Sequence, residues 1–190
     1  MQADKNPFAT DRVERLLSFR PGWAGLTWRQ LDNQWREADY RGSITGRHGS
    51  GKTTLISEWK QRLTINGADI IDLFLNTDSK SLQAHQWSAL ASEKVKNQLV
   101  ILDGEEQLSY LHKRKFYKLT QRAKGVIITR HRKNHLRTLT HLDTNIETLH
   151  QCVQEIAPKD YDKLEPFLES CWKDKKGNIR EILLSCYDLV

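Results

Sequence analysis

The run from Gly46 to Thr53, GRHGSGKT, constrains the fold more than any other part of this sequence, because it fits the pattern G-x-x-x-x-G-K-[ST] at every position. Its glycines let the backbone curl so that successive N–H groups point inward, where they bind phosphate oxygens. Such a loop needs a strand before it and a helix behind it. The neighbouring sequence supplies both, with a short strand predicted at Gly42–Thr45 and a helix at Thr53–Leu63.

Each position of this loop has an expected role in holding a nucleotide. The side chain of Lys52 reaches the β- and γ-phosphates, and the hydroxyl of Thr53 ligates Mg²⁺. His48 occupies a variable position, where the backbone rather than the ring binds phosphate. The residues expected to hold the nucleotide are Gly46, Arg47, His48, Gly49, Ser50, Gly51, Lys52, Thr53 and Thr54.

Outside the loop, predicted strands alternate with predicted helices. This alternation predicts an α/β fold, a three-layer α/β/α sandwich with a mostly parallel five-stranded sheet. The further strands are expected at residues 68–77, 98–103, 125–130 and 145–152, and the helices at 81–95, at 106–123 and after Pro158.

The chain is expected to have three parts. Residues 1–40 are interpreted as a helical lead-in packed on the core. Residues 41–156 are interpreted as the nucleotide-binding core, and residues 157–190 as a small helical C-terminal lid.

Asp103 ends the apolar run that begins at Leu99 and is the second candidate ligand of the site. The run has the composition of a buried parallel strand. In open α/β sheets the carboxyl ends of the strands face the ligand crevice. A carboxylate at this place is suited to hold a water molecule of the Mg²⁺ shell, so we expect Thr53 and Asp103 to form the metal site.

Together these residues resemble the P-loop NTPases with an extra strand between the Walker A and Walker B strands, a class that includes the AAA+ and STAND ATPases. The 51 positions from Lys52 to Asp103 leave room for a helix, a strand and a helix, as in that class. The resemblance covers about Arg41 to Cys152. It implies a P-loop fold, ATP as the nucleotide and hydrolysis of its γ-phosphate, with Lys52 as a catalytic residue.

The resemblance also bears on the catalytic base. Members of the class often place a glutamate directly after the Walker B aspartate, where it polarises the attacking water. Here Gly104 occupies that place, so the base is expected at Glu105 or Glu106, unless both only flank the next helix. Hydrolysis is therefore expected to be slow, and the protein to act as a nucleotide-driven regulatory switch.

Three more residues match the class by position. Thr129 and Arg130 end the fourth predicted strand, where these ATPases sense the γ-phosphate. Arg180 lies in GNIREILL, which resembles the sensor-2 helix that reaches back to the nucleotide. The alternatives are a surface charge for Arg130 and an ordinary first-turn residue for Arg180.

One segment carries the basic balance of the chain, whose net charge is +6. Residues 111–142 contain ten Lys or Arg and no Asp or Glu. Such a segment attracts phosphates, or else forms a solvated helix face. It supports a first alternative function, a DNA-associated ATPase or loader that uses residues 113–137. No DNA-reading helix of known type accompanies it.

A second alternative is a P-loop small-molecule kinase. In this interpretation Asp78 is the base for a substrate hydroxyl, and Arg130, Arg132 and Arg137 form an arginine-rich lid. The apolar strand that ends at Asp103 argues against it. A kinase needs an acceptor before it releases ADP, whereas an ATPase does not.

The remaining composition bears on location and partners. The 190 residues contain no run of about 20 apolar residues and no signal-peptide-like start, so we expect a soluble, cytoplasmic protein without a membrane partner. Cys152, Cys171 and Cys186 lack a metal-binding spacing and are expected to be free thiols. A protein partner that senses the nucleotide is expected without being identified, and an oligomer is left open.

Overall fold

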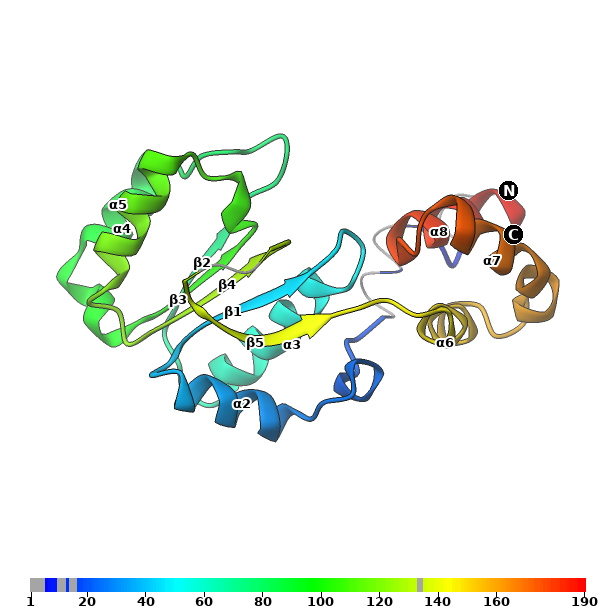
Figure 1. Cartoon of the computed structure of the whole chain (residues 1–190), viewed down its shortest axis with the longest axis horizontal. Coiled ribbons are helices and arrows are strands. Elements are labelled where there is room, and N and C mark those ends of the chain that lie inside the picture. The colour runs from blue at the N-terminus through cyan, green and yellow to red at the C-terminus, as the bar shows by residue number, and fades with distance from the viewer. Residues whose placement is uncertain (1–5, 10–12, 14–16, 133–134) are drawn as a thin grey trace.

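A five-stranded, all-parallel sheet forms the centre of the structure (Figure 1). The computed structural model describes residues 6–9, 13, 17–132 and 135–190. The strands are Arg41–Gly46 (β1), Ile70–Phe74 (β2), Leu99–Asp103 (β3), Gly125–Arg130 (β4) and Arg137–Leu142 (β5). Their order across the sheet is β2-β3-β4-β1-β5, so β4 lies between β1 and β3.

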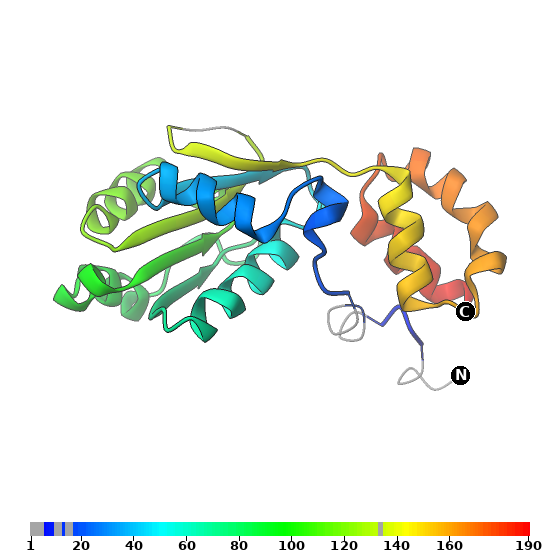
Figure 2. The same ribbon diagram turned by 90° about the horizontal axis from the view of Figure 1, so that it is seen from below.

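Helices cover both faces of the sheet, which gives the α/β fold and the three layers expected from the sequence (Figures 1 and 2). One face is covered by α2 (Trp28–Glu37) and α3 (Lys52–Ile65), and the other by α4 (Ala84–Ala91) and α5 (Tyr110–Thr120). Short 3-10 turns lie at Pro21–Ala24, Glu93–Asn97 and Glu105–Gln107.

The central strand β3 shows how the sequence fills the two cores. Leu99 and Ile101 belong to the core under α2 and α3, and Val100 and Leu102 to the core under α4 and α5. Because successive side chains point to opposite faces and both faces are covered, the strand is a continuous apolar run. This run places Asp103 at the carboxyl edge of the sheet.

The predicted strand at residues 145–152 is wrong, because this segment begins helix α6 (Ile146–Ile156). The side chain of Asn145 caps the helix by accepting a hydrogen bond of 2.7 Å from the backbone N–H of Thr148. The buried residues of α6 recur at helical spacing. The fifth strand is β5 instead, which pairs in parallel with β1.

A short connection joins β4 to β5, and its described residues form no helix. Because these strands are parallel to β1, residues 131–136 return from the carboxyl edge of the sheet to its amino edge; residues 133 and 134 lie outside the described part. His135 packs against Tyr117 of α5, with ring centroids 4.4 Å apart, so the connection passes on the α5 side. His131 stays at the carboxyl edge.

Helices α6, α7 (Tyr161–Asp174) and α8 (Ile179–Cys186) form a helical part beside the sheet, followed by a 3-10 turn at Tyr187–Leu189 (Figures 1 and 2). Buried residues of α6 belong to the same core as those of α7 and α8, so the helical part begins at Ile146. The sequence instead predicts that the helical lid begins at residue 157.

The core of the helical part also contains Phe8 and the three cysteines, which are free thiols as predicted. Burial raises the pKa of Cys152 and of Cys186 to about 12, so both thiols stay protonated at neutral pH. Of the predicted lead-in, α2 packs on the sheet, while residues 1–5, 10–12 and 14–16 lie outside the described part. No helix in the described ranges has the length and apolar character needed to span a bilayer.

Candidate functional site

The glycine-rich loop connects β1 to α3 at the carboxyl edge of the sheet, as the sequence predicts. β1 ends at Gly46 and α3 begins at Lys52. Gly49 has φ +72° and Gly51 has φ +83°, left-handed values that residues other than glycine adopt only with strain. The N-terminus of the 14-residue helix α3 thus stands behind a curled loop, which is the geometry of an anion site.

The side chain of Lys52 folds back over this loop. Its Nζ atom donates hydrogen bonds to the carbonyl oxygens of Gly46, at 2.8 Å, and Arg47, at 2.7 Å. Burial lowers the pKa of Lys52, and the nearby carboxylates of Glu106 and Asp103 partly oppose this shift. A buried ammonium group is therefore held at the loop by weak carbonyl partners that an anion can replace.

The other loop side chains differ in how open they are. Arg47, His48 and Thr53 are exposed, and Thr54 is half-buried. The hydroxyl oxygen of Ser50 is buried and has no hydrogen-bond partner among the described residues. The Thr53 hydroxyl, in the first turn of α3, is thus accessible to a ligand, and the Ser50 hydroxyl has unused hydrogen-bonding capacity.

Asp103 lies at the end of β3 and is held by Thr129 of the neighbouring strand β4. The Thr129 hydroxyl donates to Oδ1 of Asp103 and accepts a 2.9 Å hydrogen bond from the backbone N–H of Gly104. The second carboxylate oxygen, Oδ2, is buried without a hydrogen-bond partner in the described part of the chain. Thr129, which is buried, therefore orients Asp103 and leaves one oxygen for a ligand.

Gly104 stands where the resemblance leads us to expect a glutamate, and its backbone conformation accounts for the glycine. Its φ of +87° is left-handed, and a Cβ atom here would lie 2.2 Å from the carbonyl oxygen of Leu75. No residue with a side chain fits this position without moving the backbone. Apart from Asp103, the next carboxylates that the chain offers after this position are those of Glu105 and Glu106.

Glu105 is buried and already engaged by other side chains. The hydroxyl of Tyr117 donates to its Oε1 at 2.9 Å. Its Oε2 pairs with the guanidinium of Arg130 at 3.3 Å and lies 3.8 Å from Nζ of Lys113. The structure thus ties Arg130 to Glu105 rather than leaving it free at the loop.

Glu106 is the glutamate that faces the loop. Its charge acts on Lys52 and on His48, and its Oε1 lies 2.9 Å from Nε2 of His131. The rings of His131 and His48 pack against each other with centroids 3.8 Å apart and planes tilted by 43°. Burial lowers the pKa of His48, and the positive charges of His131 and Lys52 act in the same direction.

The helical part reaches the loop through the start of α8. A Cβ atom on Gly49 would meet the side-chain oxygen of Asn178 at 1.9 Å, so Asn178 lies directly on the loop. Asn178 also caps α8 by accepting from the N–H of Glu181 at 3.3 Å. Arg180 is exposed, and none of the described residues forms a hydrogen bond or ion pair with it.

Three residues that contact this site were missed from the sequence. Tyr117 binds Glu105, His131 binds Glu106, and Asn178 covers Gly49. Two of them had a sequence signal: His131 directly follows the strand-end pair Thr129 and Arg130, and Asn178 lies in GNIREILL.

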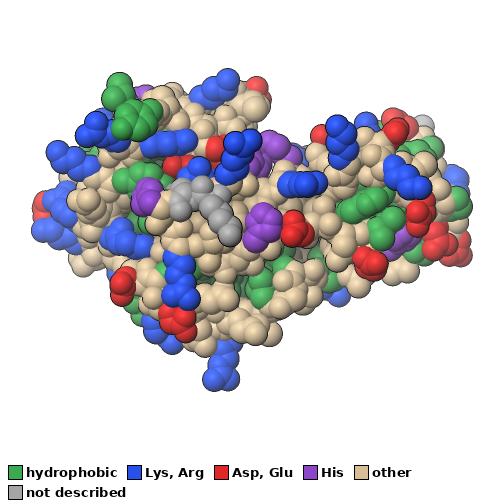
Figure 3. All heavy atoms as spheres, viewed as in Figure 1, with side chains coloured by type: hydrophobic (Ala, Val, Ile, Leu, Met, Phe, Trp, Pro, Cys, Tyr) green, Lys and Arg blue, Asp and Glu red, His purple; other side chains and the backbone are tan. Residues whose placement is uncertain are grey.

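The basic segment does not form one continuous face, because β4 runs through it. Arg122 pairs with Glu93 and Arg137 with Glu37. Lys and Arg side chains gather instead over α4 and α5 (Figure 3). Three exposed cations of α5 form no ion pair with a described residue: Arg114, Lys115 and Lys118.

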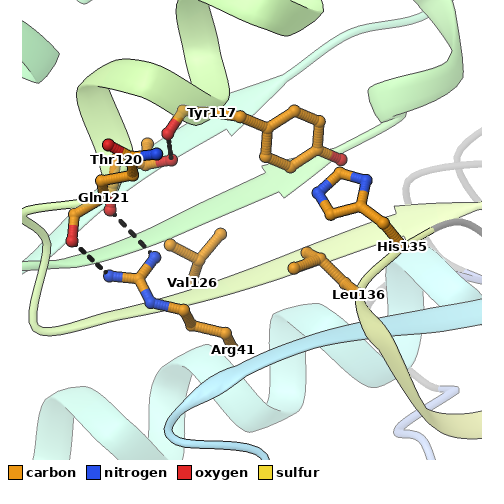
Figure 4. A pocket seen from close by; sticks show the side chains of 7 residues that line it. All are labelled: Arg41, Tyr117, Thr120, Gln121, Val126, His135 and Leu136. Carbon is orange, nitrogen blue, oxygen red and sulfur yellow. Dashed lines mark hydrogen bonds between the residues drawn. The ribbon is translucent and has the colours of Figure 1, made fainter.

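A separate cavity of about 180 Å³ lies between α5 and the residues that precede β5 (Figure 4). Several of its polar groups are bound within the chain. The guanidinium of Arg41 donates to the carbonyl oxygens of Thr120, Gln121 and Ala123 at 2.8–3.0 Å, and Tyr117 points toward His135. Arg41 therefore ties the end of α5 to β1.

Comparisons with known proteins add no relative to this description. No protein-family model matches the chain, and no curated protein matches it either.

Proposed function

We propose that this protein binds ATP with Mg²⁺, hydrolyses it slowly and acts as a nucleotide-driven switch. The observation that carries the proposal is a curled loop over which Lys52 folds back, at the same edge of the sheet where Thr129 orients Asp103 and leaves its Oδ2 without a described partner. The placement of β4 between β1 and β3 supports the resemblance to P-loop NTPases with an extra strand, including the AAA+ and STAND ATPases.

The residues present fit a magnesium ion. Oδ2 of Asp103 is buried with its hydrogen-bonding capacity unused within the described chain, and Thr53 presents an exposed hydroxyl. Mg²⁺ prefers oxygen ligands and keeps several waters, so one hydroxyl and one carboxylate, directly or through water, suffice beside phosphate oxygens. When bound, the ion neutralises charge on the β- and γ-phosphates.

The chain's own groups divide the remaining work. Loop N–H groups and the N-terminus of α3 bind phosphate, and Lys52 exchanges its carbonyl partners for phosphate oxygens. Glu106 is the base in this proposal, since Glu105 is engaged by Tyr117 and Arg130. Thr129 keeps Asp103 in place. The contact of Asn178 with the loop links nucleotide binding to the helical part. Arg180 joins the site only if the helical part moves toward the loop.

The experiment is nucleotide binding by Lys52→Ala, with Lys60→Ala as the matched control. Lys60 lies on the same helix and pairs with Asp72 away from the loop. Wild type and Lys60→Ala should bind a fluorescent ATP analogue only with Mg²⁺, and Lys52→Ala should bind it at least about tenfold more weakly, a loss of about 1.4 kcal/mol. Equal affinities of wild type and Lys52→Ala would contradict the proposal.

Phosphate release without an acceptor separates this function from the small-molecule kinase alternative. In that alternative Asp78 abstracts the proton of an acceptor hydroxyl. Asp78 lies exposed in a turn, where its backbone N–H donates to the side chain of Asn76 at 3.0 Å. A kinase would release ADP only when its acceptor is present.

A second candidate function is supported by α5. The outer face of this helix presents Arg114, Lys115 and Lys118 without paired carboxylates in the described structure, and the helix contains no acidic residue. Tyr110 is 73% exposed at its first turn, and Nζ of Lys115 lies 4.5 Å from the ring centroid of Trp87. Cations beside aromatic rings suit single-stranded nucleic acid, so the nucleic-acid alternative rests on α5 rather than on all of residues 113–137.

A further inference from the structure

We infer that His131 is a positioning residue that ties Glu106 to the phosphate-binding loop. The inference rests on the proposed function, in which Glu106 orients the attacking water. One ring nitrogen, Nε2, lies 2.9 Å from Oε1 of Glu106. The other, Nδ1, lies 3.0 Å from the carbonyl oxygen of Gly46 and 3.4 Å from Nζ of Lys52.

The ring of His131 is fixed on several sides. It packs against the ring of His48, its side chain is only 25% exposed, and both of its nitrogens have partners. Glu106 is less constrained, since its Oε2 is buried without a hydrogen-bond partner among the described residues. His131 is therefore the described group that determines where the Glu106 carboxylate lies.

The donors and acceptors show why this link survives nucleotide binding. Nε2 faces a carboxylate and must donate, while Nδ1 either accepts from Lys52 or, in the doubly protonated ring, donates to Gly46. A triphosphate draws Lys52 away from both Nδ1 and the Gly46 carbonyl. The carbonyl is then free to accept from Nδ1–H of the doubly protonated ring, while Nε2–H still donates to Glu106 and keeps it beside the loop.

The contrast with Glu105 supports this assignment. Tyr117 donates to Glu105, and Arg130 and Lys113 lie 3.3 and 3.8 Å from its Oε2, whereas the side chain of Glu106 has one described partner, which itself contacts the loop. Gly104 keeps the glutamate from directly following Asp103, so the position of the Glu106 carboxylate is not fixed by its place in the chain. His131, at the end of β4, fixes it instead.

The first test measures single-turnover ATP hydrolysis and ATP affinity of three variants. We expect His131→Ala to lower the hydrolysis rate roughly 10- to 100-fold, while its ATP affinity changes less than about threefold. His131→Gln can still donate to Glu106 and should recover most of the rate. His135→Ala, a change in the same connection without contact to Glu106, should match wild type. An unchanged rate in His131→Ala, or equal losses in the Ala and Gln variants, would overturn the inference.

The second test does not depend on hydrolysis. Imidazole ¹H–¹⁵N spectra of the nucleotide-free protein should show that Glu106→Gln shifts the ring signals of His131 and leaves those of His135 in place. Unmoved His131 signals would overturn the inference even if the enzyme works. If Glu106→Gln shifts the His131 signals but the wild type shows no magnesium-dependent ATP binding, the contact between His131 and Glu106 stands and only the proposed function is contradicted.

Discussion

At the scale of single residues, two adjacent glutamates have different surroundings. Glu105 is 1% exposed and is bound by Tyr117 and Arg130. Glu106 is partly exposed and faces Lys52 and His131. A carboxylate that serves a reacting water needs access to the site, whereas one surrounded by permanent partners stabilises the fold.

Neutral variants separate these two roles. Glu106→Gln should lower the single-turnover hydrolysis rate about 100-fold or more with an unchanged free energy of unfolding, because it removes a proton acceptor from the site. Glu105→Gln should lower the free energy of unfolding by about 1–3 kcal/mol, because it leaves the half-buried Arg130 without its charge partner. Urea denaturation and hydrolysis are measured on both proteins, and the reverse pattern would assign the base to Glu105.

At the scale of elements, α5 concentrates positive charge that the sequence spreads over a longer segment. Its exposed face combines Tyr110 and Leu111, which are 73% and 72% exposed, with three unpaired cations. The strand β4 and the ion pairs of Arg122 and Arg137 remove the rest of the segment from this face. The surface suited to bind a polyanion is therefore the exposed face of one helix, α5.

Charge reversal on α5 tests this surface. The triple variant Arg114→Glu, Lys115→Glu, Lys118→Glu should bind a labelled single-stranded oligonucleotide at least about tenfold more weakly than wild type, with a slope of log affinity against log salt reduced by about 2, since each phosphate contact contributes about 0.7. Fluorescence anisotropy between 50 and 200 mM salt (about the range where such contacts are lost) gives both values. The control is the triple variant Lys159→Glu, Lys173→Glu, Lys175→Glu on the helical part. If it weakens oligonucleotide binding equally, the loss comes from the net charge and not from α5.

At the scale of the whole molecule, the two chain ends complete one core. Phe8 is fully buried among the helices that follow β5. The side chain of Asn6 donates to the carbonyl oxygens of Tyr187, at 2.7 Å, and Val190, at 3.3 Å. The helical part that covers Gly49 therefore depends on residues from both termini.

Truncation of Phe8 should destabilise this part. Phe8→Ala should lower the free energy of unfolding by about 3–5 kcal/mol, because it leaves a cavity in a closed core. Phe74→Ala, which removes the same ring from a side chain that is 54% exposed, should change it by less than about 1 kcal/mol. Urea unfolding followed by tryptophan fluorescence measures both, and equal effects would show that Phe8 adds nothing to the helical core.

The sequence by itself determined the local features of this protein. The glycines and Lys52 specify a loop between a strand and a helix, and the apolar run before Asp103 specifies a buried strand, because turn chemistry and side-chain periodicity act over a few residues. The alternation of these elements was enough to predict the layered α/β fold.

Only the tertiary structure decided the partners of the site residues. Whether Glu105 or Glu106 faces the loop depends on Arg130, Tyr117 and His131, which reach them across neighbouring elements. The fifth strand likewise depends on pairing between Gly42 and Arg137. The segment predicted as a strand at residues 145–152 forms α6 instead, because Asn145 caps the helix and its apolar side chains pack in the helical core. Contacts between residues far apart in the chain leave no periodic signal, so the sequence does not display them.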